Sequence, residues 1–280
     1  MIQLRKIFCV IDPTTSNQRA LARATYIGGA TGAAVHAYVS TFAGADRPAE
    51  DRDELREVEV ARYRAWLESL IAPLRERGID VTTEVDWQDD WRAALGPAAS
   101  RAGADLIIKS SYRRAAPQRR LLKTADWTLL RTADCPVMLA KAEKVVRDGI
   151  VMAAVNLNAR DPDHEALNDA VLAYANGIAS AAGADLHVVN AFAGSENFIH
   201  TPDLARRAGV PRANAHTGDA APDELITQVA RDVGAQLVVI GSVARRGLAA
   251  AVVGNTAERI LDRLDCDVVT IFRTQGEAQG

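Results

Sequence analysis

Short apolar runs alternate with longer, more polar stretches along most of the chain. In the first half, the short runs predict five β-strands, at residues 6–12, 34–40, 80–85, 106–110 and 136–140. The longer stretches fit helices at residues 17–30, 49–76, 91–102 and 124–132. A run that is apolar throughout, such as Leu237–Ile240, is typical of a strand buried on both faces. Alternating strands and helices therefore predict an α/β fold with a parallel sheet.

The second half of the chain repeats motifs of the first half. The segment RAGADLIIKSSYRR around Gly103 resembles DVGAQLVVIGSVARR around Gly234, 131 residues later. The two halves also begin alike, because KIFCVID resembles IVMAAVN. A repeat of this length is typical of a duplicated domain. We therefore predict two copies of one domain, at residues 1–144 and 145–280.

Composition and charge exclude several classes of protein. The 280 residues are 48% hydrophobic and 25% charged, as in an ordinary globular protein. A net charge of −3 gives no basic field for nucleic acid, and no apolar run approaches the roughly 20 residues that cross a bilayer. The three cysteines lack CxxC spacing, so neither a disulfide framework nor a zinc site is predicted. We expect a cytoplasmic protein with no nucleic-acid partner and no membrane insertion.

A glycine-spaced segment, GSVARRGLAAAVVGNTAERIL, follows the apolar run that ends at Ile240. Glycine lets backbone N–H groups approach phosphate oxygens closely, and a helix that starts near Asn255 would add its N-terminal dipole. The pattern predicts a phosphate site after this strand. The alternative is a turn that is retained only for folding.

Several blocks of the chain resemble the universal stress protein family in its tandem-domain form. They are VVIGSVARRGLAAAVVGNTAERILDRLDCDVVTI, TADWTLLRTADCPVMLAK and the repeated AGADL segments. The resemblance implies two tandem domains, each a five-stranded parallel sheet with helices on both faces. It also implies a stress-response protein, some of whose relatives bind ATP. The two domains would form the family dimer within one chain, through strands at 136–140 and 268–272, and a further homodimer is open.

The resemblance also implies a ligand site in the second domain. The family's G-x2-G-x9-G-[S/T] loop is partly kept, with Ala244 at the second glycine and Asn255 at the hydroxyl position. The Asp at the end of the first family strand corresponds to Asn156, and the backbone after the second strand's His corresponds to Val188. The implied residues are Asn156 for the sugar, Val188 for the base, and Gly241, Gly247, Gly254, Asn255 and Thr256 for phosphate.

The first domain keeps a different part of the same pattern. Asp12 and Ala37 match the sugar and base positions, but Arg113 and Lys123 stand where the phosphate loop has Ala244 and Gly254. Basic side chains could bind an anion by charge in place of the degenerate loop. The alternatives are a local cap at Asp12 and a solvated basic loop.

The leading expectation is a non-catalytic stress-response protein that binds a small phosphorylated ligand, mainly in its second domain. ATP with Mg²⁺, or another nucleotide, fits this expectation. One alternative is a scaffold or lipid-type carrier without nucleotide binding. Another is a slow ATPase, which would need a carboxylate facing the loop. No GxSxG, HExxH or full P-loop motif occurs, so no catalytic residues and no metal ligands are predicted.

Overall fold

The structure is a computed structural model that describes residues 4–41, 49–112, 125–143, 145, 148–159, 161–244 and 255–274. The chain divides into two compact units, Leu4–Ala140 and Lys141–Gly280, which we call the first and second domains. Each unit is an α/β domain with a parallel sheet, which confirms the predicted fold class. Among the described residues, no helix is both long and apolar enough to span a membrane.

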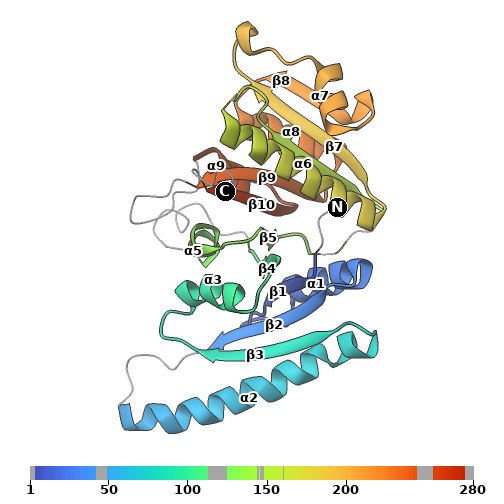
Figure 1. Ribbon diagram of the computed structural model, residues 1–280. Helices are drawn as coiled ribbons and strands as arrows, with labels where there is room; N and C mark the ends of the chain where they lie inside the picture. Colours follow the sequence, from blue (N-terminus) through green and yellow to red (C-terminus); the bar gives the residue numbers. More distant parts are fainter. Residues whose placement is uncertain are drawn as a thin grey trace. The chain divides into compact units, whose positions relative to one another are not determined.

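The sheet of the first domain has the strand order β3-β2-β1-β4-β5, and neighbouring strands are parallel (Figure 1). The strands are β1 (Lys6–Val10), β2 (Ala34–Thr41), β3 (Val81–Trp87), β4 (Leu106–Ser110) and β5 (Val137–Ala140). The described helices are α1 (Arg19–Thr31), α2 (Ala49–Glu76), α3 (Trp91–Arg101) and α5 (Ala125–Thr132). The predicted elements of this half agree with these bounds to within about two residues.

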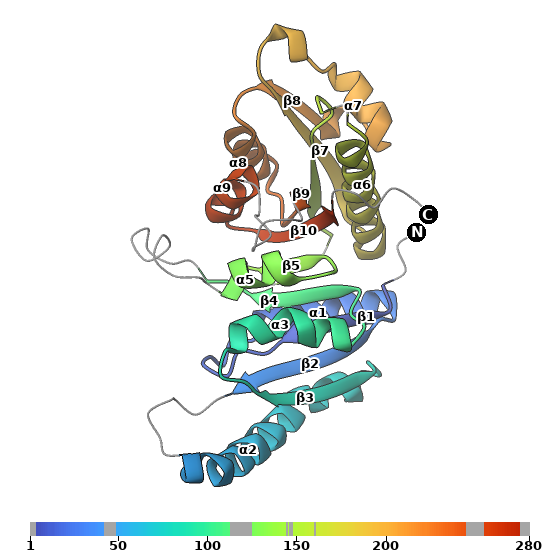
Figure 2. The same ribbon diagram turned by 60° about the vertical axis from the view of Figure 1, so that its left-hand side comes forward.

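The sheet of the second domain has the corresponding order β10-β9-β6-β7-β8. Its strands are β6 (Ile150–Val155), β7 (Asp185–Phe192), β8 (Ala215–Asp219), β9 (Leu237–Ala244) and β10 (Asp267–Thr274). Its described helices are α6 (Pro162–Ala182), α7 (Thr201–Ala208), α8 (Pro222–Val233) and α9 (Asn255–Arg263), with 3₁₀ turns η1 (Ser195–Asn197) and η2 (Arg212–Asn214). Figure 2 shows α8 and α9 on one face of this sheet and α6 and α7 on the other.

The repeated AGADL-type sequence blocks each contain a glycine in a backbone conformation that other residues rarely adopt. Each block contains a glycine just after a helix and shortly before a strand, at Gly32, Gly103, Gly183 and Gly234. Their φ angles are 74°, 65°, 65° and 69°, in the left-handed region that disfavours other residues. The glycine ends the helix and turns the chain into the next buried strand. The repeat is therefore retained at the helix-to-strand turns of both domains.

Strand order places a crevice at the centre of each sheet. In the second domain, β6 lies between β7 and β9, and the chain leaves β6 toward β7 before it later crosses to β9. The connections after β6 and β9 therefore diverge at the carboxyl edge of the sheet. Ligands of open α/β sheets bind in crevices of this kind.

Candidate ligand-binding site in the second domain

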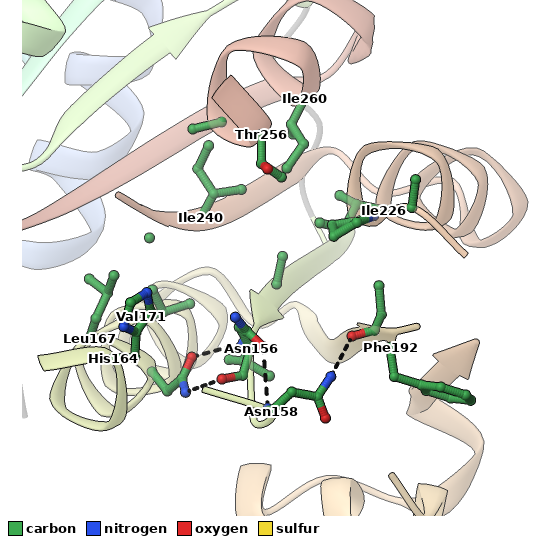
Figure 3. Close-up of a pocket in the computed structure, with 18 of the residues that line it drawn as sticks. Asn156, Asn158, His164, Leu167, Val171, Phe192, Ile226, Ile240, Thr256 and Ile260 are labelled. Carbon is green, nitrogen blue, oxygen red and sulfur yellow. Dashed lines mark hydrogen bonds between the residues drawn. The ribbon is translucent and has the colours of Figure 1, made fainter. Parts of the chain in front are cut away.

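A cavity of about 990 Å³ opens at the carboxyl ends of β6, β7 and β9 (Figure 3). Its size is at the upper end of the range for small-molecule sites. Three strand ends and the N-terminal parts of α6, α8 and α9 contribute to its walls. Most of its lining is apolar, including Val155, Leu167, Val171, Phe192, Ile226, Ile240, Ala257 and Ile260. Neutral polar side chains add hydrogen-bonding groups, from Asn156, Asn158, Asn168, Asn197, Ser242 and Thr256.

Asn156, the first residue after β6, is held by the side chain of Asn168 on α6. The backbone N–H of Asn156 donates to Oδ1 of Asn168 at 2.9 Å, and Nδ2 of Asn168 donates back to the Asn156 carbonyl at 2.9 Å. Asn168 is buried, whereas Asn156 is exposed to the cavity. The amide of Asn168 thus satisfies both backbone groups where the strand ends, which fixes the position of Asn156.

Two further amides hold the rest of this loop. The backbone N–H of Leu157 donates to Oδ1 of the buried Asn190 at 2.7 Å, and Nδ2 of Asn158 donates to the carbonyl of Ala191 at 3.1 Å. The backbone N–H of Asn158 also donates to Oδ1 of Asn156 at 3.2 Å. This wall of the cavity is therefore ordered by neutral groups before any ligand binds, which lowers the entropic cost of binding.

Gly241, in β9, is required by the packing of α6 against the sheet. A Cβ atom added at Gly241 would lie 2.7 Å from Cγ of Leu167 and 2.8 Å from its Cδ2. The glycine therefore lets the first half of α6 approach β9 closely. This role differs from the phosphate contact that the loop motif predicts for the same residue, although Gly241 also lines the cavity.

The opposite wall is the start of α9. The helix begins at Asn255, as predicted, and Thr256 in its first turn lines the cavity. Two arginines of α9 bind the carboxylate of Asp223 on α8: Nε of Arg259 at 3.2 Å and Nη1 of Arg263 at 3.0 Å. Asp223 is only 3% exposed. This double ion pair holds α9, and with it the Thr256 wall, against α8.

Electrostatically, the cavity is close to neutral. His164, on the first turn of α6, is the one residue with an ionisable side chain among the described residues of the lining. Its Nδ1 lies 2.7 Å from Oδ2 of Asp161, the residue that caps α6. The hydrogen bond from His164 lowers the pKa of Asp161 from its ordinary value.

The structure brings together three of the seven residues predicted for this site. Asn156, Gly241 and Thr256 line the one cavity. Gly247 and Gly254 lie outside the described residues, as does the side chain of Asn255.

Val188 does not line the cavity. It is fully buried in the middle of β7, where it pairs with Ala153 and Ala215. The strand continues to Phe192, so Ala191 and Phe192 are the β7 residues at the cavity. A backbone contact from β7 to a ligand in this cavity would therefore come from the end of the strand and not from Val188.

Residues 3–141 and 181–271 match the model of the universal stress protein family. The chain belongs to the universal stress protein family. The first matched region contains β1 to β5, and the second contains β7, β8, β9 and most of β10, which agrees with two tandem domains of this family.

Full-length relatives support the tandem organisation. Universal stress protein E of Escherichia coli (strain K12) is 24% identical over 299 aligned residues, covering 97% of this chain and 95% of the relative. A functionally unknown protein from Pseudomonas aeruginosa PAO1 has a crystal structure with a TM-score of 0.79 and 30% identity, over 96% of this chain and 92% of that one. A universal stress protein from Archaeoglobus fulgidus DSM 4304, with 17% identity and a TM-score of 0.73 over 97% of this chain and 100% of that one, shares the fold.

The first domain of this universal stress protein has an ion pair at the positions that correspond to two residues of the cavity wall. The repeat offset equates Ile240 and Ala257 of the cavity with Lys109 and Asp126. Nζ of Lys109 lies 2.7 Å from Oδ1 of Asp126, and Ser111 Oγ donates to Oδ2 of Asp126 at 2.7 Å. Both charged side chains are largely buried, at 15% and 22% exposed. Charge-paired side chains thus stand where the second domain has apolar cavity wall.

Asp12, predicted for a first-domain site, lies in a tight local turn. Its Oδ1 accepts hydrogen bonds from the backbone N–H and the hydroxyl of Thr14, at 2.9 and 2.6 Å. Tyr112 bridges the end of β4 and the loop after β1: its hydroxyl donates to the Asn17 carbonyl at 3.3 Å, and its ring lies under Arg19. The geometry agrees with the local-cap alternative for Asp12.

The other first-domain candidates do not form a described site. Ala37 is fully buried within β2, paired with Cys9 and Thr83. Arg113 and Lys123 lie outside the described residues. Among the residues that the structure describes, no group of three or more His, Cys, Asp or Glu side chains is placed to hold a metal ion.

The sequence motifs missed the residues that build the cavity by packing. Asn168, Asn190, Phe192 and His164 belong to none of the motifs quoted above. The one available signal was DPDHE, in which Asp161 caps a helix and His164 falls in its first turn.

Proposed function

We propose that this chain is a non-catalytic, ligand-responsive stress protein that binds a nucleoside phosphate in the cavity of its second domain. One observation carries the proposal: Asn156, Gly241 and Thr256, three residues of the implied nucleotide site, line one cavity of about 990 Å³. The cavity lies at the carboxyl edge of the sheet, where ligands of this fold class bind. Its volume is sufficient for a nucleotide.

The lining suggests how such a ligand would lie. The exposed side chain of Asn156 can bind sugar hydroxyls, and the apolar faces formed by Phe192, Ile226 and Ile240 suit a base. Phosphate groups would lie at the first turn of α9, where the hydroxyl of Thr256 and the helix dipole favour an anion. ATP with Mg²⁺ belongs to this ligand class. The described lining offers no carboxylate to hold the ion, so we propose binding without hydrolysis.

Copying the ion pair of the first domain into the cavity provides the test. The double variant Ile240→Lys/Ala257→Asp places Lys109 and Asp126 equivalents in the cavity wall. In a thermal shift assay with ADP or ATP and Mg²⁺, the wild type should be stabilised by about 2.7 kcal/mol at 100 times the dissociation constant. The double variant should lose this stabilisation. The reverse variant in the first domain, Lys109→Ile/Asp126→Ala, should keep it.

A second candidate function follows from the apolar character of the lining. A ligand with a long hydrocarbon body would also fit a cavity walled by Val171, Phe192, Ile240 and Ile260. A fluorescent fatty acid tests this lipid-type carrier. If it binds the wild type but not the Ile240→Lys/Ala257→Asp variant, and millimolar ADP neither binds nor displaces it, the carrier function replaces the nucleotide proposal.

A further inference from the structure

Among the described residues, the first turns of α6 and α9 each contribute one polar side chain to the cavity lining. His164 is the third residue of α6, and Thr256 is the second residue of α9. Both helices begin at the carboxyl edge of the sheet, so their N-terminal turns border the same cavity. His164 is the ionisable residue of this pair. Figure 3 shows it on the α6 side of the cavity, beside Leu167 and Val171.

The hydrogen bonds of Asp161 determine which ring nitrogen of His164 carries the proton. Oδ2 of Asp161 lies 2.7 Å from Nδ1, while its Oδ1 accepts the backbone N–H of His164 at 3.1 Å. An ionised carboxylate only accepts hydrogen bonds, so Nδ1 carries the proton. Nε2 is then the nitrogen that can meet a ligand. It accepts a hydrogen bond when the ring is neutral and donates a charge-assisted bond when the ring is protonated.

Acidic residues lie next to His164 in the sequence at the start of α6. Asp161 is the N-cap of α6, and Asp163 and Glu165 lie in its first turn with His164. The described cavity residues from β6, β7, β9, α8 and α9 are all uncharged. Among the described side chains of the lining, His164 is therefore the one that can form an ion pair with an anionic ligand.

We propose that His164 binds the anionic group of the ligand through Nε2, and that the affinity for phosphorylated ligands therefore rises as the pH falls. The inference rests on the proposed function and deepens it, because it names the residue that distinguishes a phosphorylated ligand from a neutral one. His164 and Thr256 then contact the anion from the two helix starts. Asp161 acts as a positioning residue.

Calorimetry with ADP and adenosine, at about pH 8 and about pH 5.5, tests the proposal on the full chain. The variant His164→Gln keeps a hydrogen-bonding side chain but cannot be protonated. The ratio of wild-type to variant affinity cancels the ionisation of the ligand itself. For ADP we expect a ratio within about twofold at the higher pH and about tenfold in favour of the wild type at the lower pH. For adenosine the ratio should be the same at both pH values.

The control is His200→Gln, because His200 is an exposed histidine outside the cavity lining. This variant should keep the pH dependence of the wild type. An ADP ratio for His164→Gln that does not change with pH would overturn the proposal.

A second measurement does not depend on nucleotide binding. Inorganic sulfate keeps its charge across this pH range, so it serves as the probe for a bare anion. The imidazole resonance of His164, assigned by its absence in His164→Gln, should titrate at higher pH when sulfate is present, while that of His200 should not move. If neither ADP nor adenosine binds but this shift occurs, the proposed function fails and His164 remains an anion-binding residue. Without the shift, the assignment to His164 is wrong.

Discussion

The side-chain amide of Asn168 forms two reciprocal hydrogen bonds with the backbone of Asn156, both 2.9 Å long. The first domain has the same arrangement with different residues. Oε1 of Gln18 accepts the N–H of Asp12 at 3.1 Å, and Nε2 of Gln18 donates to the Asp12 carbonyl at 2.6 Å. Each domain therefore uses an amide from its first helix region to hold a residue that lies just beyond its central strand. In the second domain this residue faces the cavity.

Replacing Asn168 by leucine should weaken both the fold and the binding site. The N–H and carbonyl of Asn156 would lose their partners, at a cost of about 1–3 kcal/mol in the free energy of unfolding. Asn156 would also move, so the affinity for ligand should fall. Denaturation followed by circular dichroism, with calorimetry for the ligand, measures both effects. The matched variant Gln18→Leu should cost similar stability and leave ligand affinity unchanged. Equal loss of affinity in both variants would contradict the role given to Asn168.

Gly241→Ala should destabilise the second domain through Leu167. The new methyl group would lie 2.7 Å from Cγ of Leu167, so α6 must shift or Leu167 must leave its rotamer. Overpacking of this kind costs about 1–3 kcal/mol. In a double-mutant cycle, Leu167→Ala should recover much of that cost, because it removes the atoms that clash. If the two changes are simply additive, the glycine is needed for another reason, such as close approach of a ligand to the backbone.

The fold was predictable because its determinants are local. Buried strands are continuous apolar runs, and the left-handed glycines at 103 and 234 mark the same helix-to-strand turn in each repeat. The site was predictable where a motif coincides with the end of an element. Asn156 follows β6 directly and Thr256 lies in the first turn of α9, so both are placed at the sheet edge by chain order alone.

The rest of the site depends on packing between distant segments, which a single sequence does not specify. Val188 was assigned to the cavity because of its place after His187, but β7 continues for four more residues and buries it. The contact of Gly241 with Leu167 depends on how α6 crosses the sheet. The Lys109–Asp126 ion pair could not be predicted for the same reason, because in the sequence each residue alone looks like an ordinary surface charge.

The pair formed by His187 and His216 should make stability depend on pH. Nδ1 of His187 lies 3.0 Å from Nε2 of His216, with the ring planes only 10° apart, so one ring donates and the other accepts. Burial lowers the pKa of His187 from its ordinary value of 6.5. Burial, and then the charge on His187, lower that of His216. Asp185 and Asp232 act in the opposite direction.

Because both pKa values are lower in the folded protein, the unfolded chain binds more protons as the pH falls below about 6.5. The stabilisation is complete above that pH and is lost as the pH falls through the folded pKa values. The midpoint of thermal unfolding should therefore drop between about pH 7.5 and pH 5.5. His216→Gln, which can still bond to His187, should make this drop smaller. His200→Asn should leave the drop as it is. An unchanged drop in His216→Gln would show that other groups cause it.

Asp223→Asn should loosen the α9 wall of the cavity. The substitution removes the negative charge that binds Arg259 and Arg263 at 3.2 and 3.0 Å, in a site where the acid is 3% exposed. Breaking a buried ion pair costs about 3–5 kcal/mol, and the exposed sides of the two arginines place this case at the lower end. The expected result is a lower unfolding midpoint by circular dichroism and weaker ADP binding, because Thr256 is no longer held in place.

Asp203→Asn, which breaks an exposed ion pair with Arg206 on α7, is the control and should cost less than about 1 kcal/mol. If Asp223→Asn lowers stability but leaves ADP affinity intact, the start of α9 is positioned by the rest of its packing, and the phosphate contact must be sought on the α6 side of the cavity.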